Sequence, residues 1–267
     1  MSARDDISGI ADASRPNAGR IYDYFLGGTH NFEIDRQAAK EVLKHAPHMP
    51  NYLMLIRWFL GVATRRLCKE GFAKFLDFAS GLPTLDNIHQ VAPEGTKVIY
   101  SDIDPVTVAY AQELIGKNPN LRFVHCEAER PEELLNSGVV EELFGNDRRV
   151  AIGVNGILYF MRDENVAHSL KVLYDWADEG SKLFLCDSDA GGEETEDAKD
   201  IREIYKRVGQ PLYLRSREET IDLVKPWQVD EPGVMLLEKW VEMEATVAQR
   251  VEEKWGQGAM NGMILKK

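Results

Sequence analysis

The stretch "KFLDFASGLPT", residues 74–84, decides the fold class. A short apolar run ends in Asp77, and two small residues, Ala79 and Gly81, follow it directly. This is the pattern of a buried strand that passes through a tight turn into a helix. We expect the backbone of this loop to approach a ligand closely, because small side chains leave it room.

Short apolar runs alternate with segments of helical spacing downstream of this strand. Four further runs follow it in order, at 97–102, 122–126, 149–154 and 182–187. Such alternation is typical of a parallel sheet whose crossover helices cover both faces. We therefore predict an α/β fold with a doubly wound, Rossmann-like sheet.

The two ends of the chain have different patterns. Segments 227–240 and 258–267 look like two further strands, and no crossover helix is apparent between them. We therefore predict that they form an antiparallel pair at the sheet edge. The sheet would then have seven strands, the last of them antiparallel. In the N-terminal part, apolar residues recur at helical spacing over 53–67, and Arg57 lies outside this apolar stripe. Asp35 is predicted to be the N-cap of an earlier helix.

We accordingly divide the chain into two parts. Residues 1–73 form an N-terminal helical segment that covers the site, and residues 74–267 form one compact Rossmann-like domain. The 267 residues, 44% of them hydrophobic, are enough for a large core.

Composition excludes several classes of function. The net charge of −12 opposes tight nonspecific contact with nucleic acid or an anionic membrane. The three cysteines lie far apart, so neither a disulfide framework nor a metal site is expected. The N-terminus has no basic and apolar leader pattern, and the most apolar tract is too short for a membrane span, so a cytoplasmic protein is expected.

Acidic residues follow the second and third predicted strands. Asp102, followed by Ile103, lies about twenty residues beyond the first loop, the separation at which a carboxylate accepts hydrogen bonds from ribose hydroxyls. Glu127 is placed to accept from an adenine amino group, with the Ala128 amide facing a ring nitrogen. In open α/β sheets the ligand lies at these carboxyl ends.

The loop fits a dinucleotide poorly. In the pattern GxGxxG, Ala79 replaces the first glycine and Thr84 the third. A pyrophosphate needs closer backbone approach than this loop offers, whereas S-adenosylmethionine carries only an amino-acid group at that end. The sequence therefore favours S-adenosylmethionine as the cofactor and disfavours an NAD-dependent oxidoreductase.

The chain resembles the Rossmann-like (class I) S-adenosylmethionine-dependent methyltransferases, and within them the group first catalogued as a domain of unknown function. That group's signature, roughly "ARIYDYLLGGKDNFxADR", appears as "GRIYDYFLGGTHNFEIDR" at 19–36, and its "DIGTGLPT" appears as "DFASGLPT" at 77–84. The segments "YSDIDP", "RSREE" and "EPGVMLLEKW" follow in order, so the resemblance covers essentially the whole chain.

The resemblance implies S-adenosyl-L-methionine as cofactor and assigns its site. Ala79 and Ser80 replace the family's glycine and threonine, and Tyr159 replaces a family histidine, so no proton-handling role is carried over to that position. The expected cofactor-binding residues are Asp77, Ala79, Ser80, Gly81, Asp102, Ile103, Glu127, Ala128, Asn155, Tyr22, Asn31 and Arg36.

Methyl transfer is an in-line displacement that mainly requires alignment of the reacting groups. Asn155 and Tyr159, after the fourth strand, are the candidate catalytic residues; turn capping and packing are the alternatives for them. We expect a small-molecule acceptor, no metal, and a monomer or homodimer. A regulatory protein that binds S-adenosylmethionine without turnover is the alternative function.

The paired glycines Gly27 and Gly28 lie inside the family signature. They permit a turn that would bring Tyr22, Tyr24, His30, Asn31 and Arg36 toward the methionine end of the cofactor and the acceptor. We predict that this segment is a lid over the site; a turn that only docks the helices is the alternative.

Overall fold

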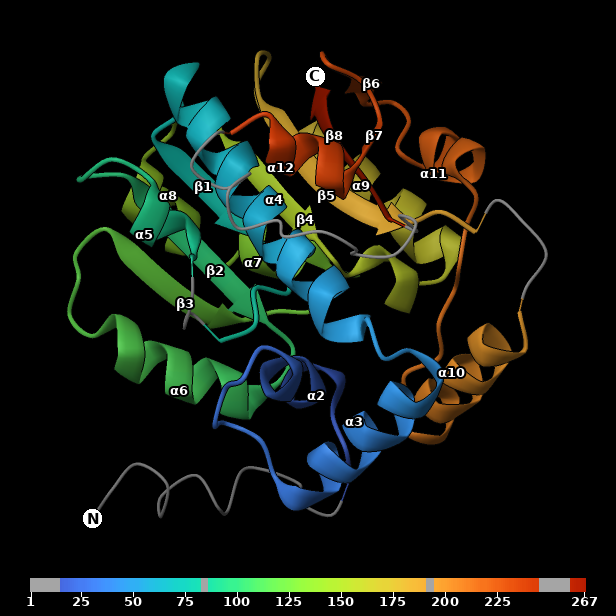
Figure 1. Cartoon of the computed structure of the whole chain (residues 1–267). Coiled ribbons are helices and arrows are strands. Elements are labelled where there is room, and N and C mark those ends of the chain that lie inside the picture. The colour runs from blue at the N-terminus through green and yellow to red at the C-terminus, as the bar shows by residue number, and fades with distance from the viewer. Residues whose placement is uncertain (1–14, 83–85, 191–194, 245–259) are drawn as a thin grey trace.

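The computed structural model describes residues 15–82, 86–190, 195–244 and 260–267 (Figure 1). Residues 83–85, where the stretch 74–84 is predicted to enter a helix, lie outside these ranges. The five predicted parallel strands are confirmed. The strands are β1 (Lys74–Asp77), β2 (Lys97–Asp102), β3 (Leu121–His125), β4 (Ala151–Asn155), β5 (Lys182–Ser188), β6 (Gln228–Val229), β7 (Met235–Leu236) and β8 (Met260–Lys266).

The strands form one mixed sheet in the order β3-β2-β1-β4-β5-β8-β6, with β7 also paired to β8. β1 to β5 are parallel, and β8 is antiparallel to β5, so the predicted doubly wound sheet with an antiparallel end is confirmed. The order reverses between β1 and β4. A switch point of this kind opens a crevice at the carboxyl ends of the strands.

Helices cover both faces of the sheet (Figure 1). One buried cluster joins α2, α3, α4, α6 and α12 to one face, and a second joins α7, α8 and α9 to the other. The helices are α2 (Ala18–Phe25), α3 (Glu33–His45), α4 (Met49–Lys69), α5 (Ile88–Val91), α6 (Pro105–Ile115), α7 (Pro131–Leu135), α8 (Val139–Phe144), the 3₁₀ helix η1 (Leu158–Phe160), α9 (Asp163–Trp176), α10 (Glu196–Arg207), α11 (Arg217–Leu223) and α12 (Leu237–Glu242).

The predicted strand over 227–240 is wrong. The segment forms the two short strands β6 and β7 around a turn in which the Gly233 amide donates to the Asp230 carbonyl at 2.8 Å, and then the helix α12. Leu237, Trp240 and Val241 are fully buried at helical spacing, which explains why the chain coils there. The described sheet therefore has eight strands rather than seven.

Asp35 is not the N-cap that we predicted. Helix α3 begins at Glu33 with Phe32 as its N-cap, and the Asp35 carboxylate reaches back to accept from the Phe32 amide at 2.8 Å. The same carboxylate accepts from Arg20 Nε of α2 at 2.8 Å and is fully buried. A long-range ion pair therefore sets where this helix starts.

None of the helices within the described residues combines the length and the hydropathy that crossing a bilayer requires.

Candidate functional site

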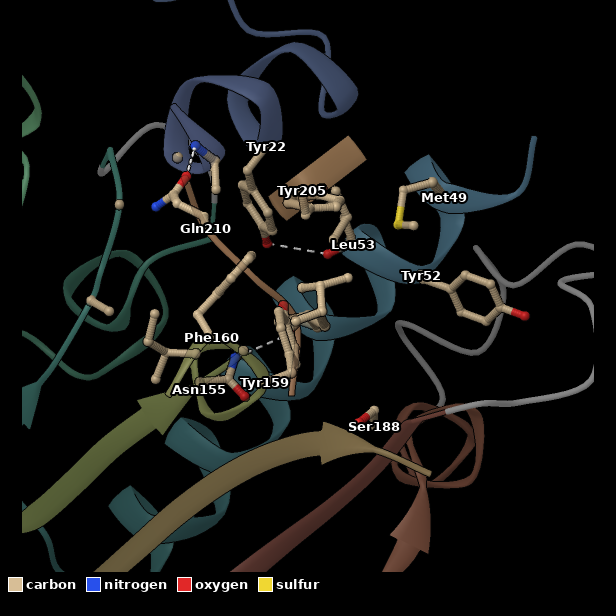
Figure 2. A pocket seen from close by; sticks show the side chains of 18 of the residues that line it. Tyr22, Met49, Tyr52, Leu53, Asn155, Tyr159, Phe160, Ser188, Tyr205 and Gln210 are labelled. Carbon is tan, nitrogen blue, oxygen red and sulfur yellow. Dashed lines mark hydrogen bonds between the residues drawn. The ribbon is translucent and has the colours of Figure 1, made fainter. Parts of the chain in front are cut away.

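A cavity of about 970 Å³ lies at the carboxyl edge of the sheet. Loops after β1, β2, β4 and β5 form one side of it, and the helices α2, α4 and α10 form the other (Figure 2). Nine of the residues expected at the site line this cavity: Tyr22, Asp77, Ala79, Ser80, Gly81, Asp102, Ile103, Asn155 and Tyr159.

The small residues of the loop after β1 line the cavity. Ala79 and Gly81 have φ values of 52° and 64°, in the left-handed region where a side chain is unfavourable. The Ser80 hydroxyl donates to the Asp77 carbonyl at 2.7 Å, and the Ser80 amide donates to the Ser101 carbonyl at 2.9 Å. These bonds fix the loop against β2.

Asp102 connects this loop to the end of β2. Its Oδ2 accepts from the Gly81 amide at 3.0 Å and its Oδ1 from the Asp104 amide at 2.9 Å. Each oxygen retains a lone pair, so the carboxylate can still accept hydrogen bonds from a diol. Burial raises the pKa of Asp102 to about 6, partly offset by these backbone donors.

Asp77 is 2% exposed at the end of β1. Burial raises the pKa of its carboxyl group to about 7, while the Arg57 guanidinium opposes that rise. A Cβ at Gly153, on the neighbouring strand β4, would collide with the Asp77 carboxylate. The glycine is therefore required for this acid to fit between the strands.

Asn155 ends β4 and faces the cavity (Figure 2). Its Nδ2 donates to the Ile56 carbonyl of α4 at 3.2 Å, whereas its Oδ1 is buried and has no hydrogen-bond partner among the described residues. A buried acceptor without a donor costs about 1–3 kcal/mol. A donor group on a bound ligand would remove that cost.

Four tyrosines line the cavity, and three of them, Tyr22, Tyr159 and Tyr205, have strongly raised pKa values (Figure 2). The Tyr159 ring lies 4.8 Å from that of Phe160, which lies 5.7 Å from that of Tyr205, and the Tyr22 hydroxyl donates to the Leu53 carbonyl at 3.3 Å. Burial raises the pKa of Tyr205 to about 12 and raises the pKa values of Tyr22 and Tyr159 as well. These phenols are neutral near pH 7, so they donate hydrogen bonds and do not act as bases.

The paired glycines form a turn organised around Asp23. Its Oδ2 accepts from the His30 amide and from Asn31 Nδ2, both at 2.8 Å. A Cβ at Gly28 would collide with the same carboxylate, and Arg36 Nη1 donates to Asn31 Oδ1 at 3.0 Å. Asn31 and Arg36 are therefore outside the cavity lining and hold the turn whose Asp23, Gly27 and Gly28 line it.

The structure does not bring every expected residue into the cavity. Glu127 and Ala128, after β3, are absent from its described lining. Glu127 pairs with Arg130 at 3.4 Å, and the Ala128 carbonyl accepts from the Ser169 hydroxyl at 2.7 Å. These contacts place both residues in the loop that packs on α9.

Sequence reasoning missed the helical side of the cavity. Met49, Leu53 and Ile56 of α4 and Tyr205 of α10 line it, together with Arg57. Apolar residues at helical spacing indicate only a buried face, whether that face meets a core or a ligand. Arg57, the charge that breaks the stripe, was the one signal in the sequence.

Among the described residues, one group of side chains outside the cavity lining has metal-ligating chemistry. His45 Nδ1 of α3 lies 3.3 Å from Asp197 Oδ1 and 3.3 Å from Asp200 Oδ2, both on α10. Both acids are exposed, and the imidazole contacts both carboxylates directly. The group joins α3 to α10 beside the cavity.

The residues present fit S-adenosylmethionine. The loop after β1 offers backbone without side-chain obstruction, Asp102 offers carboxylate oxygens for a ribose, and Asn155 offers a buried acceptor. The remaining described lining is largely apolar and aromatic, as suits an organic ligand.

A family model described as S-adenosyl methyltransferase matches residues 5–265. The chain belongs to this family. Its cofactor is therefore S-adenosyl-L-methionine, and the protein is an S-adenosylmethionine-dependent methyltransferase, as the resemblance implied.

Solved structures agree with this assignment. A putative methyltransferase from Thermobifida fusca is 28% identical to this methyltransferase, with 97% of each chain covered and a TM-score of 0.86. A DUF574 family protein from Streptomyces avermitilis is 26% identical, with 96% of this chain and 99% of that chain covered and a TM-score of 0.84.

More distant structures share the fold alone. Magnesium protoporphyrin IX methyltransferase from Synechocystis, solved with bound S-adenosylmethionine, is 11% identical over 100% of this chain and 99% of that chain, with a TM-score of 0.55. No curated protein matches the chain.

Proposed function

We propose that this methyltransferase transfers the methyl group of S-adenosylmethionine to a small organic acceptor held in the same cavity. The observation that carries the proposal is the continuity of the lining. One cavity of about 970 Å³ extends from the strand-end residues Asp77 and Asp102 to the aromatic side chains Tyr159, Phe160 and Tyr205. Its volume is at the upper end of the roughly 300–1,000 Å³ that small-molecule sites occupy.

Each part of the lining has a role in this proposal. Asp102 would hold the ribose, and Asn155 would accept a hydrogen bond from the cofactor's ammonium or from the acceptor. When bound, S-adenosylmethionine supplies an electrophilic methyl group on a sulfonium. The chain's residues align the two reactants and exclude water, which are the main requirements of an in-line displacement.

The N-terminal segment 1–73 would act as the cover of the site in this scheme. Its helices α2 and α4 contribute Tyr22, Leu53 and Ile56 to the cavity wall. Tyr159, as a neutral phenol, would hold the acceptor by donation rather than remove its proton. The Tyr22 hydroxyl donates to the Leu53 carbonyl and would offer the acceptor its oxygen lone pairs.

The test is turnover with a panel of small acceptors that differ in the methylated atom. The protein is incubated with S-adenosylmethionine, and S-adenosylhomocysteine is measured by mass spectrometry with and without each acceptor. We expect S-adenosylhomocysteine to be released only when a suitable acceptor is present. If the Tyr159 hydroxyl positions the acceptor, Tyr159→Phe should reduce this release at least about tenfold. Tight cofactor binding without release for any acceptor class would instead favour the regulatory, non-catalytic alternative.

A further inference from the structure

Arg57 is the buried guanidinium of the cavity. It lies on α4, is 5% exposed and lines the cavity together with Asp77. The other guanidinium in the described part of the lining, that of Arg202 on α10, belongs to an exposed residue. A cation in a buried cavity attracts an anionic group more strongly than a cation in water, because the local dielectric is lower.

Contacts on both sides fix the turn of α4 that carries Arg57. Its Nη2 donates to Asn87 Oδ1 at 2.9 Å, and Asn87, itself 1% exposed, is the residue before α5. The adjacent carbonyl, that of Ile56, accepts from Asn155 Nδ2 at 3.2 Å. The turn of α4 that carries Arg57 is thus held between the segment after β1 and the end of β4, the two strands at the switch point.

Arg57 and Asp77 line the same cavity, and above about pH 7, where Asp77 is ionised, they carry opposite charges. The guanidinium lowers the pKa values of both Asp77 and Tyr22 against the effect of burial, so its charge acts across this part of the cavity. An α-amino acid group carries one carboxylate and one ammonium, and is complementary to such a pair. In S-adenosylmethionine that group lies at one end, and the adenosine at the other end has no anion.

We infer that Arg57 binds the α-carboxylate of the cofactor and so sets the direction in which S-adenosylmethionine enters the cavity. A guanidinium forms paired, charge-assisted hydrogen bonds with a carboxylate, which fixes orientation as well as affinity. Asp77 repels the carboxylate and leaves the β1 side to the ammonium and sulfonium. The inference rests on the proposed use of this cavity as the cofactor site.

The test compares two ligands that differ only in the carboxylate: S-adenosylhomocysteine and its decarboxylated analogue. Their affinities are measured by calorimetric titration for the wild type, Arg57→Met and Arg57→Lys. Arg65→Met is the matched control, because Arg65 lies on the same helix, outside the described lining, and pairs with Glu244 at 2.6 Å. Melting curves establish that each variant is folded.

We expect Arg57→Met to weaken S-adenosylhomocysteine binding about ten- to hundredfold and to change the affinity for the decarboxylated analogue less than about threefold. Arg57→Lys should retain part of the wild-type preference, and it serves if Arg57→Met does not fold. Arg65→Met should retain all of it. Equal weakening of both ligands by the Arg57 substitutions, or an unchanged preference, overturns the inference.

Failure of the underlying proposal would look different. If the wild type bound neither ligand, the cavity would not be the cofactor site at all. If the wild type bound both with equal affinity, the site would stand and only the role of Arg57 would be lost.

Discussion

Asp77 occupies a buried position where its carboxyl group titrates far from its ordinary range. Its pKa is raised to about 7 by burial, and the unfolded chain would have the ordinary value near 3.8. Between these two pH values the folded state binds the extra proton. Its contribution to stability is therefore fully present below about pH 4 and is lost as the pH rises through about 7.

We accordingly expect Asp77→Asn, which cannot ionise, to gain stability relative to the wild type as the pH rises. The difference in the free energy of unfolding should shift in favour of the variant by about 3–4 kcal/mol between about pH 4 and about pH 8. Urea denaturation at the two pH values measures it. Asp147→Asn is the control of opposite sign, because Lys74 lowers the pKa of the exposed Asp147. A parallel response of both variants would contradict the burial of Asp77.

At the residue scale, a helix cap depends on residues close together in the sequence. Asp104 caps α6, accepting from the Val106 amide at 3.3 Å, and Ser216 with Glu219 forms the capping box of α11. Asp35 was misplaced because its main partner, Arg20, is 15 residues away. An ion pair between residues this far apart cannot be recognised from the few residues around a helix start.

The 3₁₀ helix η1, which carries Tyr159 to the cavity, is held by a single guanidinium from another part of the chain. Arg215 Nη1 donates to the Leu158 carbonyl at 2.9 Å, Nη2 to the Met161 carbonyl at 2.5 Å, and Nε to Asp163 at 2.9 Å. Arg215 is 3% exposed and does not line the cavity. It therefore supports the site through the backbone of η1.

Arg215→Met should lower the free energy of unfolding by about 3–5 kcal/mol, because it leaves the two carbonyls without their donor and the buried Asp187, 3.7 Å from Nη1, without its cation. Arg215→Lys should lose less, although one ammonium cannot reach all four partners. Arg217→Met, two residues away, is the control, since the exposed Arg217 makes one bond to the Val234 carbonyl. Denaturant unfolding distinguishes them, and equal losses for Arg215 and Arg217 would refute this account of η1.

At the level of elements, the alternation of apolar runs predicted β1 to β5 because each buried strand has its own pattern. The sequence pattern did not distinguish the short strands β6 and β7 from the helix α12 that follows them. Each of these strands pairs only two residues with β8, so its formation depends on β8 rather than on its own side chains. The helix residues that line the cavity were not predicted either. Met49 and Leu53 have the pattern of any buried helix face.

The whole molecule closes its site with segments that are distant in sequence. Eight residues within 17–28, together with residues of α10 and of the 210–214 loop, line one cavity with the strand ends. Contacts between these segments include the Ala18 amide, which donates to Gln210 Oε1 at 2.5 Å (Figure 2). A ligand inside would therefore hold both segments at once.

We expect S-adenosylhomocysteine to slow amide hydrogen exchange in residues 18–31 and 205–214 at least about tenfold, since opening of a cover must precede exchange there. Peptides of α9, on the opposite face of the sheet, serve as the internal control and should not change. Mass spectrometry of exchanged peptides gives both. If exchange slowed only in the loops after the strands, the turn at Gly27 and Gly28 would serve to pack the N-terminal helices and would not cover the ligand.

The position of β8 has a consequence for truncated or unfolded chains. β8 lies between β5 and the short strands β6 and β7, so without it the backbone of β5 would present an unpaired apolar edge, "KLFLCDS". Such an edge is a template for pairing with other chains. Chains that end before Met260 should therefore aggregate, and not merely lose part of the sheet.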